Sequence, residues 1–172
     1  GVLQQWLPEE ADADQVLAVL YNRTLKPWTV PQQLLELWVE QAVVREMLRG
    51  AVQMAAPTWN GNIGNTMPNF DPILVSGGSL VHMPRPGQVL LTLLDGLEPT
   101  GISTVLLDPN RVAPALGAVA GIKPLAATSA LDAGTLVSLG TVISPVGKAR
   151  SGETILQMRI TYEDSSVLNV EA

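Results

Sequence analysis

The sequence predicts an α/β fold in which parallel strands alternate with helices, followed by an antiparallel β meander at the C-terminal end. Two short apolar runs, 73–75 and 103–107, each end at a turn-forming segment and are followed by a helical pattern. Strands that alternate with helices imply a parallel sheet with right-handed crossovers. From 154 to 162, apolar and polar residues alternate with period two, which is typical of a strand with one wet face.

These patterns divide the 172 residues into three parts. Residues 1–31 contain a short helix, whose first turn is acidic, and a connector interrupted by two prolines. Residues 32–132 form the predicted α/β unit, and residues 133–172 form a C-terminal β extension. Between Pro57 and Pro72, the segment 58–71 is rich in Asn and Gly, which favour turns, so we expect a loop there.

Helices are predicted within the α/β unit from the spacing of apolar residues. The clearest one covers about 32–56, where apolar residues recur every four positions beside a polar stripe that contains Arg45 and Arg49. A stripe of this kind is usually a solvated face, and the alternative is that one arginine faces a ligand or a missing lobe. The other predicted helices cover about 89–97, 113–120 and 124–131.

The composition is apolar for a soluble monomer. Hydrophobic residues make up 47%, charged residues 15% and aromatic residues 4%, and the mean hydropathy is +0.25. The core must therefore be built mainly from aliphatic side chains. We expect part of the apolar surface to be covered by a partner, and the start at Gly1 in place of Met fits a piece of a larger protein.

Several classes of function are disfavoured by the same numbers. The absence of cysteine excludes disulfides, thiolate catalysis and cysteine-ligated zinc, and one histidine, His82, cannot form a histidine-rich metal site. A net charge of −6 and a pI of about 4.6 disfavour binding to nucleic acid. Because no apolar run approaches the roughly 18 residues that span a bilayer, we expect no membrane insertion and a cytoplasmic location.

The strand 73–75 followed by Gly77 and Gly78 is the most informative local feature. Two glycines at the carboxyl end of a strand let a ligand approach the backbone, and ligands of open α/β sheets bind at this end. A plain tight turn is the alternative explanation for the same residues. Gly147 and Lys148 do not form a phosphate loop, because the preceding glycine and the following Ser or Thr are missing.

Other polar residues have simpler explanations. His82 has no nucleophile or acid partner at triad spacing, so we expect a structural role for it. Asp95 and Asp108 stand at the ends of predicted elements and are expected to cap helices or form turns.

Two longer segments carry a resemblance to a known superfamily. Residues 73–79, and residues 108–120 with their small, alanine-rich helix, resemble the second lobe of the actin, Hsp70 and sugar-kinase superfamily, which has a ribonuclease H-like fold. The resemblance implies that Gly77, Gly78 and Ser79 form an adenosine-binding loop. It also implies that the helix around Leu116 is the connecting helix at the hinge between two lobes.

Three further segments resemble one family within that superfamily. Residues 40–46, 77–87 and 139–150 are similar to the glutamate (methylaspartate) mutase accessory family, also called MutL-type, and the similarity extends from about residue 20 onward. This family implies an ATP-driven reactivating or chaperone role toward a mutase that depends on adenosylcobalamin. The implied partners are the mutase subunit and the first lobe of the parent protein.

The resemblance also implies that this chain holds at most half of an ATP site. No phosphate loop with an aspartate is present, and in the superfamily that loop belongs to the first lobe. ATP and Mg²⁺ are thus implied for the full-length parent, with Gly77, Gly78, Ser79 and Arg45 as the contacts that this chain offers. We expect neither tight nucleotide binding nor hydrolysis by this chain alone, and an uncovered hinge helix would favour self-association.

The alternative function is a non-enzymatic interaction scaffold whose nucleotide loop is vestigial. Fold alone does not separate the two functions.

Overall fold

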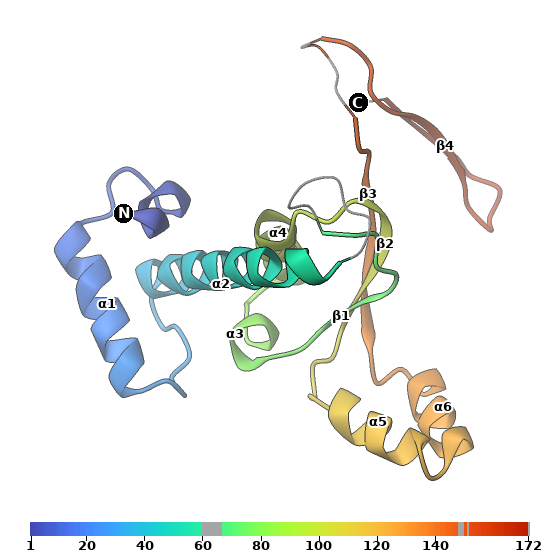
Figure 1. Cartoon of the computed structure of the whole chain (residues 1–172), viewed down its shortest axis with the longest axis horizontal. Coiled ribbons are helices and arrows are strands. Elements are labelled where there is room, and N and C mark those ends of the chain that lie inside the picture. The colour runs from blue at the N-terminus through green and yellow to red at the C-terminus, as the bar shows by residue number, and fades with distance from the viewer. Residues whose placement is uncertain (60–66, 148–149, 151, 172) are drawn as a thin grey trace.

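The computed structural model describes residues 1–59, 67–147, 150 and 152–171 and has a mixed α/β architecture (Figure 1). The helices are α1 (Ala13–Leu25), α2 (Leu34–Ala55), α3 (Gly78–Val81), α4 (Pro86–Leu97), α5 (Ala113–Ala120) and α6 (Pro124–Asp132), with 3₁₀ turns η1 (Val2–Trp6) and η2 (Ala56–Thr58). The strands are β1 (Ile73–Val75), β2 (Gly101–Leu107), β3 (Val137–Ser144), β4 (Gln157–Thr161) and β5 (Val167–Glu171).

Helix α2 connects the two hydrophobic cores of the chain. Its first turn is held by Glu36, whose carboxylate accepts hydrogen bonds from the backbone N–H groups of Gln32 at 2.6 Å and Gln33 at 3.2 Å. Such bonds satisfy donors that the start of a helix leaves without partners. Val39 belongs to the core shared with η1 and α1, whereas Val44, a little over one turn later, belongs to the core shared with the sheet.

The central sheet has the order β1-β2-β3. Strands β1 and β2 are parallel, with Val75 opposite Leu107, and the connection between them runs through α3 and α4. This arrangement confirms the predicted parallel pair. Strand β3 is antiparallel to β2, with Val137 opposite Leu107 and Ser144 opposite Gly101.

The position of β3 corrects the prediction that the tail from about Thr135 forms one antiparallel meander added to the α/β unit. Leu139 and Val142 of β3 pack against the main core, so this strand is an edge of the central sheet. Strands β4 and β5 pair antiparallel in a second sheet, which confirms antiparallel pairing in the tail but not one continuous meander. Residues 145–156 separate β3 from β4 in the sequence, more than the roughly two to five residues of common hairpin loops.

The main core lies between one face of the sheet and helices α2, α3 and α4 (Figure 1). Val89 and Val105 are its most buried large side chains, each 2% exposed. Helices α2 and α4 approach closely at Gly96, where an added Cβ would lie 2.8 Å from Cβ of Leu48. The glycine therefore sets the spacing of the two helices.

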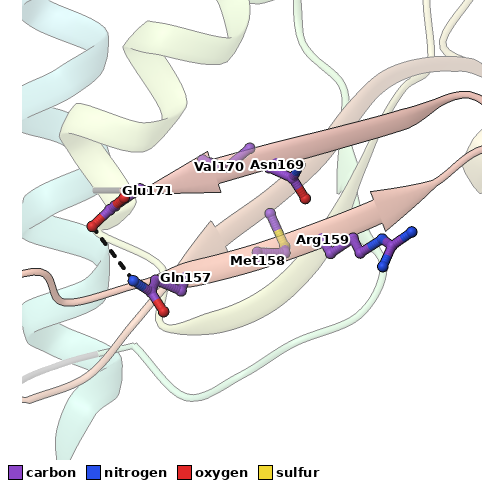
Figure 2. Close-up of a pocket in the computed structure, with 6 residues that line it drawn as sticks. All are labelled: Gln157, Met158, Arg159, Asn169, Val170 and Glu171. Carbon is purple, nitrogen blue, oxygen red and sulfur yellow. Dashed lines mark hydrogen bonds between the residues drawn. The ribbon is translucent and has the colours of Figure 1, made fainter.

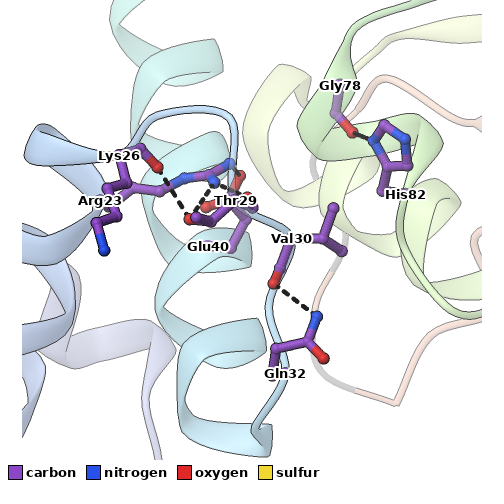
Figure 3. A network of polar contacts seen from close by, with 8 residues as sticks. All are labelled: Arg23, Lys26, Thr29, Val30, Gln32, Glu40, Gly78 and His82. Atoms are coloured by element: carbon purple, nitrogen blue, oxygen red, sulfur yellow. Dashed lines mark hydrogen bonds and ion pairs between the residues drawn. The ribbon is translucent and has the colours of Figure 1, made fainter.

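The N-terminal helices pack on α2 through the second core, which includes Leu7, Val16 and Val39. A polar network fastens the connector between α1 and α2 (Figure 3). Arg23 forms an ion pair with the nearly buried Glu40, at 2.6 Å between Nη2 and Oε1, and also donates to the carbonyl oxygen of Thr29. This network holds the proline-containing connector against α2.

Two hairpins complete the fold. Helices α5 and α6 pack mainly on each other, and α5 contains no buried residue. Ile122 and Leu125, between and at the start of these helices, are 82% and 83% exposed. The β4–β5 hairpin likewise makes most of its contacts between its own two strands.

Some predictions fall partly on residues that the structure does not describe. The predicted loop 58–71 includes 60–66, and the segment after Gly147 includes 148–149 and 151, all outside the described residues. Among the described residues, no helix has both the length and the apolarity needed to cross a membrane.

Candidate functional site

The carboxyl ends of β1 and β2 lie side by side and bring two segments together. The turn at Gly77 follows β1, and Asp108 follows β2. The backbone N–H of Asp108 donates to the carbonyl oxygen of Val75 at 2.8 Å, which extends the parallel pairing by one bond. This edge is where open α/β sheets place their ligands.

Gly77 turns the chain from β1 into α3 with backbone angles that suit only glycine. Its φ is +121° and its ψ is 145°, a conformation that side chains with a Cβ rarely adopt. Its carbonyl oxygen accepts from the N–H of Val81 at 2.9 Å, so the turn leads directly into the first hydrogen bond of α3. The sequence correctly places this glycine at a special position of the backbone.

The space around the glycine turn is open. An added Cβ at Gly77 would meet no atom within 4 Å, and one at Gly78 would meet only the ring of His82, at 3.9 Å. Gly77, Gly78 and Ser79 follow the end of β1 and are all half-buried. A flat ligand could therefore contact this backbone directly.

His82 makes its hydrogen bond to a backbone group of its own segment. Its Nδ1 lies 2.7 Å from the carbonyl oxygen of Gly78, one helical turn earlier (Figure 3). Because a carbonyl oxygen can only accept, Nδ1 carries the hydrogen in this contact. The predicted structural role of His82 agrees with this geometry.

Asp108 is completely buried and caps α5. Its Oδ1 accepts from the N–H of Val112 at 2.9 Å and its Oδ2 from the N–H of Ala113 at 2.8 Å. Burial raises the pKa of this carboxyl, but hydrogen bonds from four backbone N–H groups outweigh that effect and leave the pKa below its ordinary value. The predicted capping role is therefore confirmed.

The Asp108 cap restricts where an anion can bind at this edge. Helix N-termini attract anions through free N–H groups and the helix dipole. At α5 these donors already hold a buried carboxylate. These two backbone donors are therefore not available to a phosphate group.

Arg45 does not lie beside the glycine turn. Its Nε forms an ion pair with Oδ2 of Asp95 on α4 at 2.7 Å, and its guanidinium carbon lies 5.2 Å from the centre of the Trp6 ring. Arg49 also faces this ring, at 5.8 Å. The structure therefore unites Gly77, Gly78 and Ser79 but places Arg45 in a separate cluster, and a nucleotide contact by Arg45 stays a prediction.

The polar cluster around Trp6 was not predicted from the sequence. Glu46 accepts from Nε1 of Trp6 at 2.6 Å, from Gln5 at 2.8 Å and from Arg49 at 3.1 Å. The bond from Trp6 contributes most to holding the pKa of Glu46 below its ordinary value, and Gln5 and Arg49 add to it against the effect of burial. The cluster ties η1 to α2.

Two hollows lie away from the glycine turn. One of about 400 Å³ runs along the β4–β5 hairpin, where Gln157, Met158 and Glu171 are among its lining residues (Figure 2). The other, of about 180 Å³, lies between α2 and the end of α4, beside Arg49 and Glu98. Within the described residues, no group of three acidic or histidine side chains could hold a metal ion.

The fold and this edge define a class of protein: a mixed α/β domain with an open glycine turn after a parallel strand. Residues 2–134 match the profile of the MutL protein family, and the chain belongs to this family, which comprises the accessory proteins of glutamate mutase. The predicted family is thus confirmed. No curated protein and no solved structure matches the chain.

Proposed function

We propose that this chain is the C-terminal lobe of an ATP-binding accessory protein that reactivates an adenosylcobalamin-dependent mutase, such as glutamate mutase. Membership of the MutL family supports the accessory role and an association with the mutase subunit. The observation that supports a nucleotide site is the open turn at Gly77 and Gly78. There a planar base or a ribose could pack against backbone without meeting a Cβ.

In this proposal the nucleotide is shared between two lobes. The chain supplies the glycine turn, whereas the groups that hold Mg²⁺ and the phosphates come from a first lobe of the parent protein. The Asp108 carboxylate at the start of α5 is consistent with this division, because it disfavours a phosphate there. Phosphoryl transfer depends on positioned metal and donor groups, so hydrolysis requires the assembled protein.

The isolated chain should then bind Mg-ATP only weakly. A half-site of backbone contacts reaches about millimolar affinity, roughly −4 kcal/mol, and the net charge of −6 offers no general attraction for a polyanion. Titration calorimetry and a phosphate-release assay on the isolated chain and on the full-length parent test this. Micromolar binding or turnover by the isolated chain would show a complete site and contradict the shared arrangement.

The second candidate is a non-enzymatic scaffold for protein interaction. It is favoured by the α5–α6 hairpin, where Ile122 and Leu125 are almost fully exposed. The same calorimetry separates the candidates, because a scaffold with a vestigial loop would bind no nucleotide in the full-length parent. Co-purification of the parent with the mutase subunit would then persist without ATP.

A further inference from the structure

The face of the central sheet that points away from α2 and α4 is uncovered. Leu74 and Ile102 on this face are 48% and 56% exposed. Leu74 stands opposite Leu106, and Ile102 stands opposite Ile143, so two apolar cross-strand pairs lie on it. Figure 1 shows all three helices of the main core on the other side of the strands.

This open face is uncharged as well as apolar. Between the two apolar pairs lies the pair Thr104 and Thr141, and Ser138 stands opposite Leu106, so none of these seven side chains can ionise. The Asp71 carboxylate lies beside them, where it accepts from the backbone N–H of Thr104 at 2.8 Å. All-parallel sheets almost always have both faces covered, and β1 and β2 form a parallel pair here. An exposed face of this kind therefore marks a surface where another element packs.

The β4–β5 hairpin carries the complementary surface. Met158 stands opposite Val170 and Ile160 opposite Leu168, which places four apolar side chains on one face of the hairpin. The other face is polar: Gln157 and Glu171 are joined by a hydrogen bond of 3.4 Å, as Figure 2 shows. An isolated two-stranded hairpin is marginally stable in water, so its apolar face requires a partner.

The two hydrophobic cores contain no residue of this hairpin among those that the structure describes. Within the described part of one copy, neither the apolar face of the hairpin nor the open face of the sheet is thus covered by another element. Two apolar β surfaces pack face to face at about 10 Å. With the apolar side of the hairpin turned inward, its charged Arg159 and Glu171 stay in solvent.

We propose that two copies of this chain associate by exchanging these hairpins. The apolar face of β4–β5 from each copy packs on the open β1-β2-β3 face of the other. Among the described residues, the hairpin does not pack on the sheet of its own chain, which leaves that sheet open to a second copy. A reciprocal exchange closes with two-fold symmetry and covers both the sheet face and the hairpin face of each copy.

The proposed contact between hairpin and sheet is small, so disulfide cross-linking between engineered cysteines is the appropriate test. Each hairpin strand has five residues, about 16 Å in length, which predicts a weak and reversible dimer. Because the chain has no cysteine, disulfides can form only between the engineered cysteines. The test mixes a Thr104→Cys chain with an Ile160→Cys chain of different tag length under mild oxidation.

The expected result is a disulfide between the two differently tagged chains. The control mixture pairs Thr104→Cys with Arg159→Cys, which lies on the polar face of the hairpin. The yield of linked dimer should be at least fivefold higher with Ile160→Cys than with this control. A chain that carries both Thr104→Cys and Ile160→Cys should form linked dimers. A disulfide confined within single chains would show that the hairpin folds onto its own sheet and would overturn the exchange. Equal linking to both hairpin faces, or no linking, would overturn it too.

Sedimentation gives a second readout that requires no cysteine. The average mass of the unmodified chain should rise above 18.3 kDa with increasing concentration, and Ile160→Glu should hold it at that value. Ile122→Glu, on the exposed α5–α6 hairpin, serves as the matched control and should leave the rise unchanged. Loss of the rise in Ile122→Glu, with Ile160→Glu unaffected, would assign the contact to the helical hairpin and contradict the exchange.

Discussion

The backbone N–H of Asp108 donates to the carbonyl oxygen of Val75 at 2.8 Å, and the side chain of the same aspartate caps α5. One residue thus joins the end of β1 to the start of the helix that follows β2. Because the glycine turn also begins at the end of β1, this bond fixes the relative position of the two segments of the candidate site.

Replacing Asp108 should destabilise the whole chain. In Asp108→Ala the half-buried N–H groups of Val112 and Ala113 lose their acceptors, and loss of a helix cap typically lowers stability measurably. We expect the Tm to fall by about 3–8 °C, and by less in Asp108→Asn, which keeps one acceptor oxygen. Thermal unfolding followed by circular dichroism measures this, with the exposed Asp132→Ala as the control. Equal Tm values for Asp108→Ala and the control would contradict the capping role.

The close approach of α2 and α4 at Gly96 predicts that an alanine at this position destabilises the chain. In Gly96→Ala the new Cβ would lie 2.8 Å from Cβ of Leu48 and 3.1 Å from the carbonyl oxygen of Arg45, so one helix must shift. Overpacking of this kind costs about 1–3 kcal/mol.

Gly50→Ala is the matched control, because it also lies in a helix but meets no atom within 4 Å. It should stabilise the chain by about 0.5–1 kcal/mol through a better helix propensity. Chemical denaturation of both variants compares the free energies of unfolding. If both alanines stabilised the chain equally, the close approach at Gly96 would be disproved.

The lowered pKa of Glu46 predicts how the stability of the chain depends on pH. Its pKa is lower in the folded chain, chiefly because Trp6 donates a hydrogen bond to it, so its ionised form stabilises the fold. That contribution is complete above the pKa of the unfolded chain, near pH 4, and is lost as the pH falls through the lower folded value.

The difference in Tm between the native chain and Glu46→Gln should therefore shrink as the pH falls from 7.5 to 3.5. Glu10→Gln, at an exposed position, is the control and should show a small difference across the range. Scanning calorimetry across this range measures both. A Tm difference for Glu46→Gln that grew as the pH fell would contradict a stabilising role of the ionised carboxylate.

Local patterns predicted much of the fold because they depend on neighbours in the chain. Apolar periodicity located α2, and a short apolar run followed by glycines located β1 and the turn after it. The start of α4 at Pro86 was placed three residues too late, although proline is favoured in the first turn of a helix. The signal was present in the sequence and could have been used.

Long-range partners were not predictable from these patterns. Arg45 meets Asp95, fifty positions later, and Trp6 near the N-terminus, and no spacing rule connects residues so far apart. The pairing of β3 with β2 depends on the same kind of information, since its apolar sequence fits either sheet. Sequence reasoning therefore located the glycine turn after β1 but not the partners of Arg45, and a nucleotide contact by any of these residues stays a prediction.

The glycine turn itself supplies the last prediction, which separates backbone strain from ligand contact. Gly77 has a φ of +121°, so Gly77→Ala should lower stability by about 1–3 kcal/mol whether or not a nucleotide binds. Gly78 begins α3 without a positive φ, and its added Cβ would only touch the His82 ring at 3.9 Å, so Gly78→Ala should leave the Tm nearly unchanged.

If the turn contacts a nucleotide as proposed, the same Cβ must separate the ligand from the backbone of Gly78. Gly78→Ala in the full-length parent should then weaken ATP binding by at least tenfold while the Tm without ligand stays the same. Calorimetric titration with Mg-ATP gives the affinity, and Gly87→Ala, whose new Cβ would meet no atom within 4 Å, is the control. Unchanged affinity in Gly78→Ala would show that this turn is only a structural link between β1 and α3, because its backbone would then tolerate a side chain where the ligand should lie.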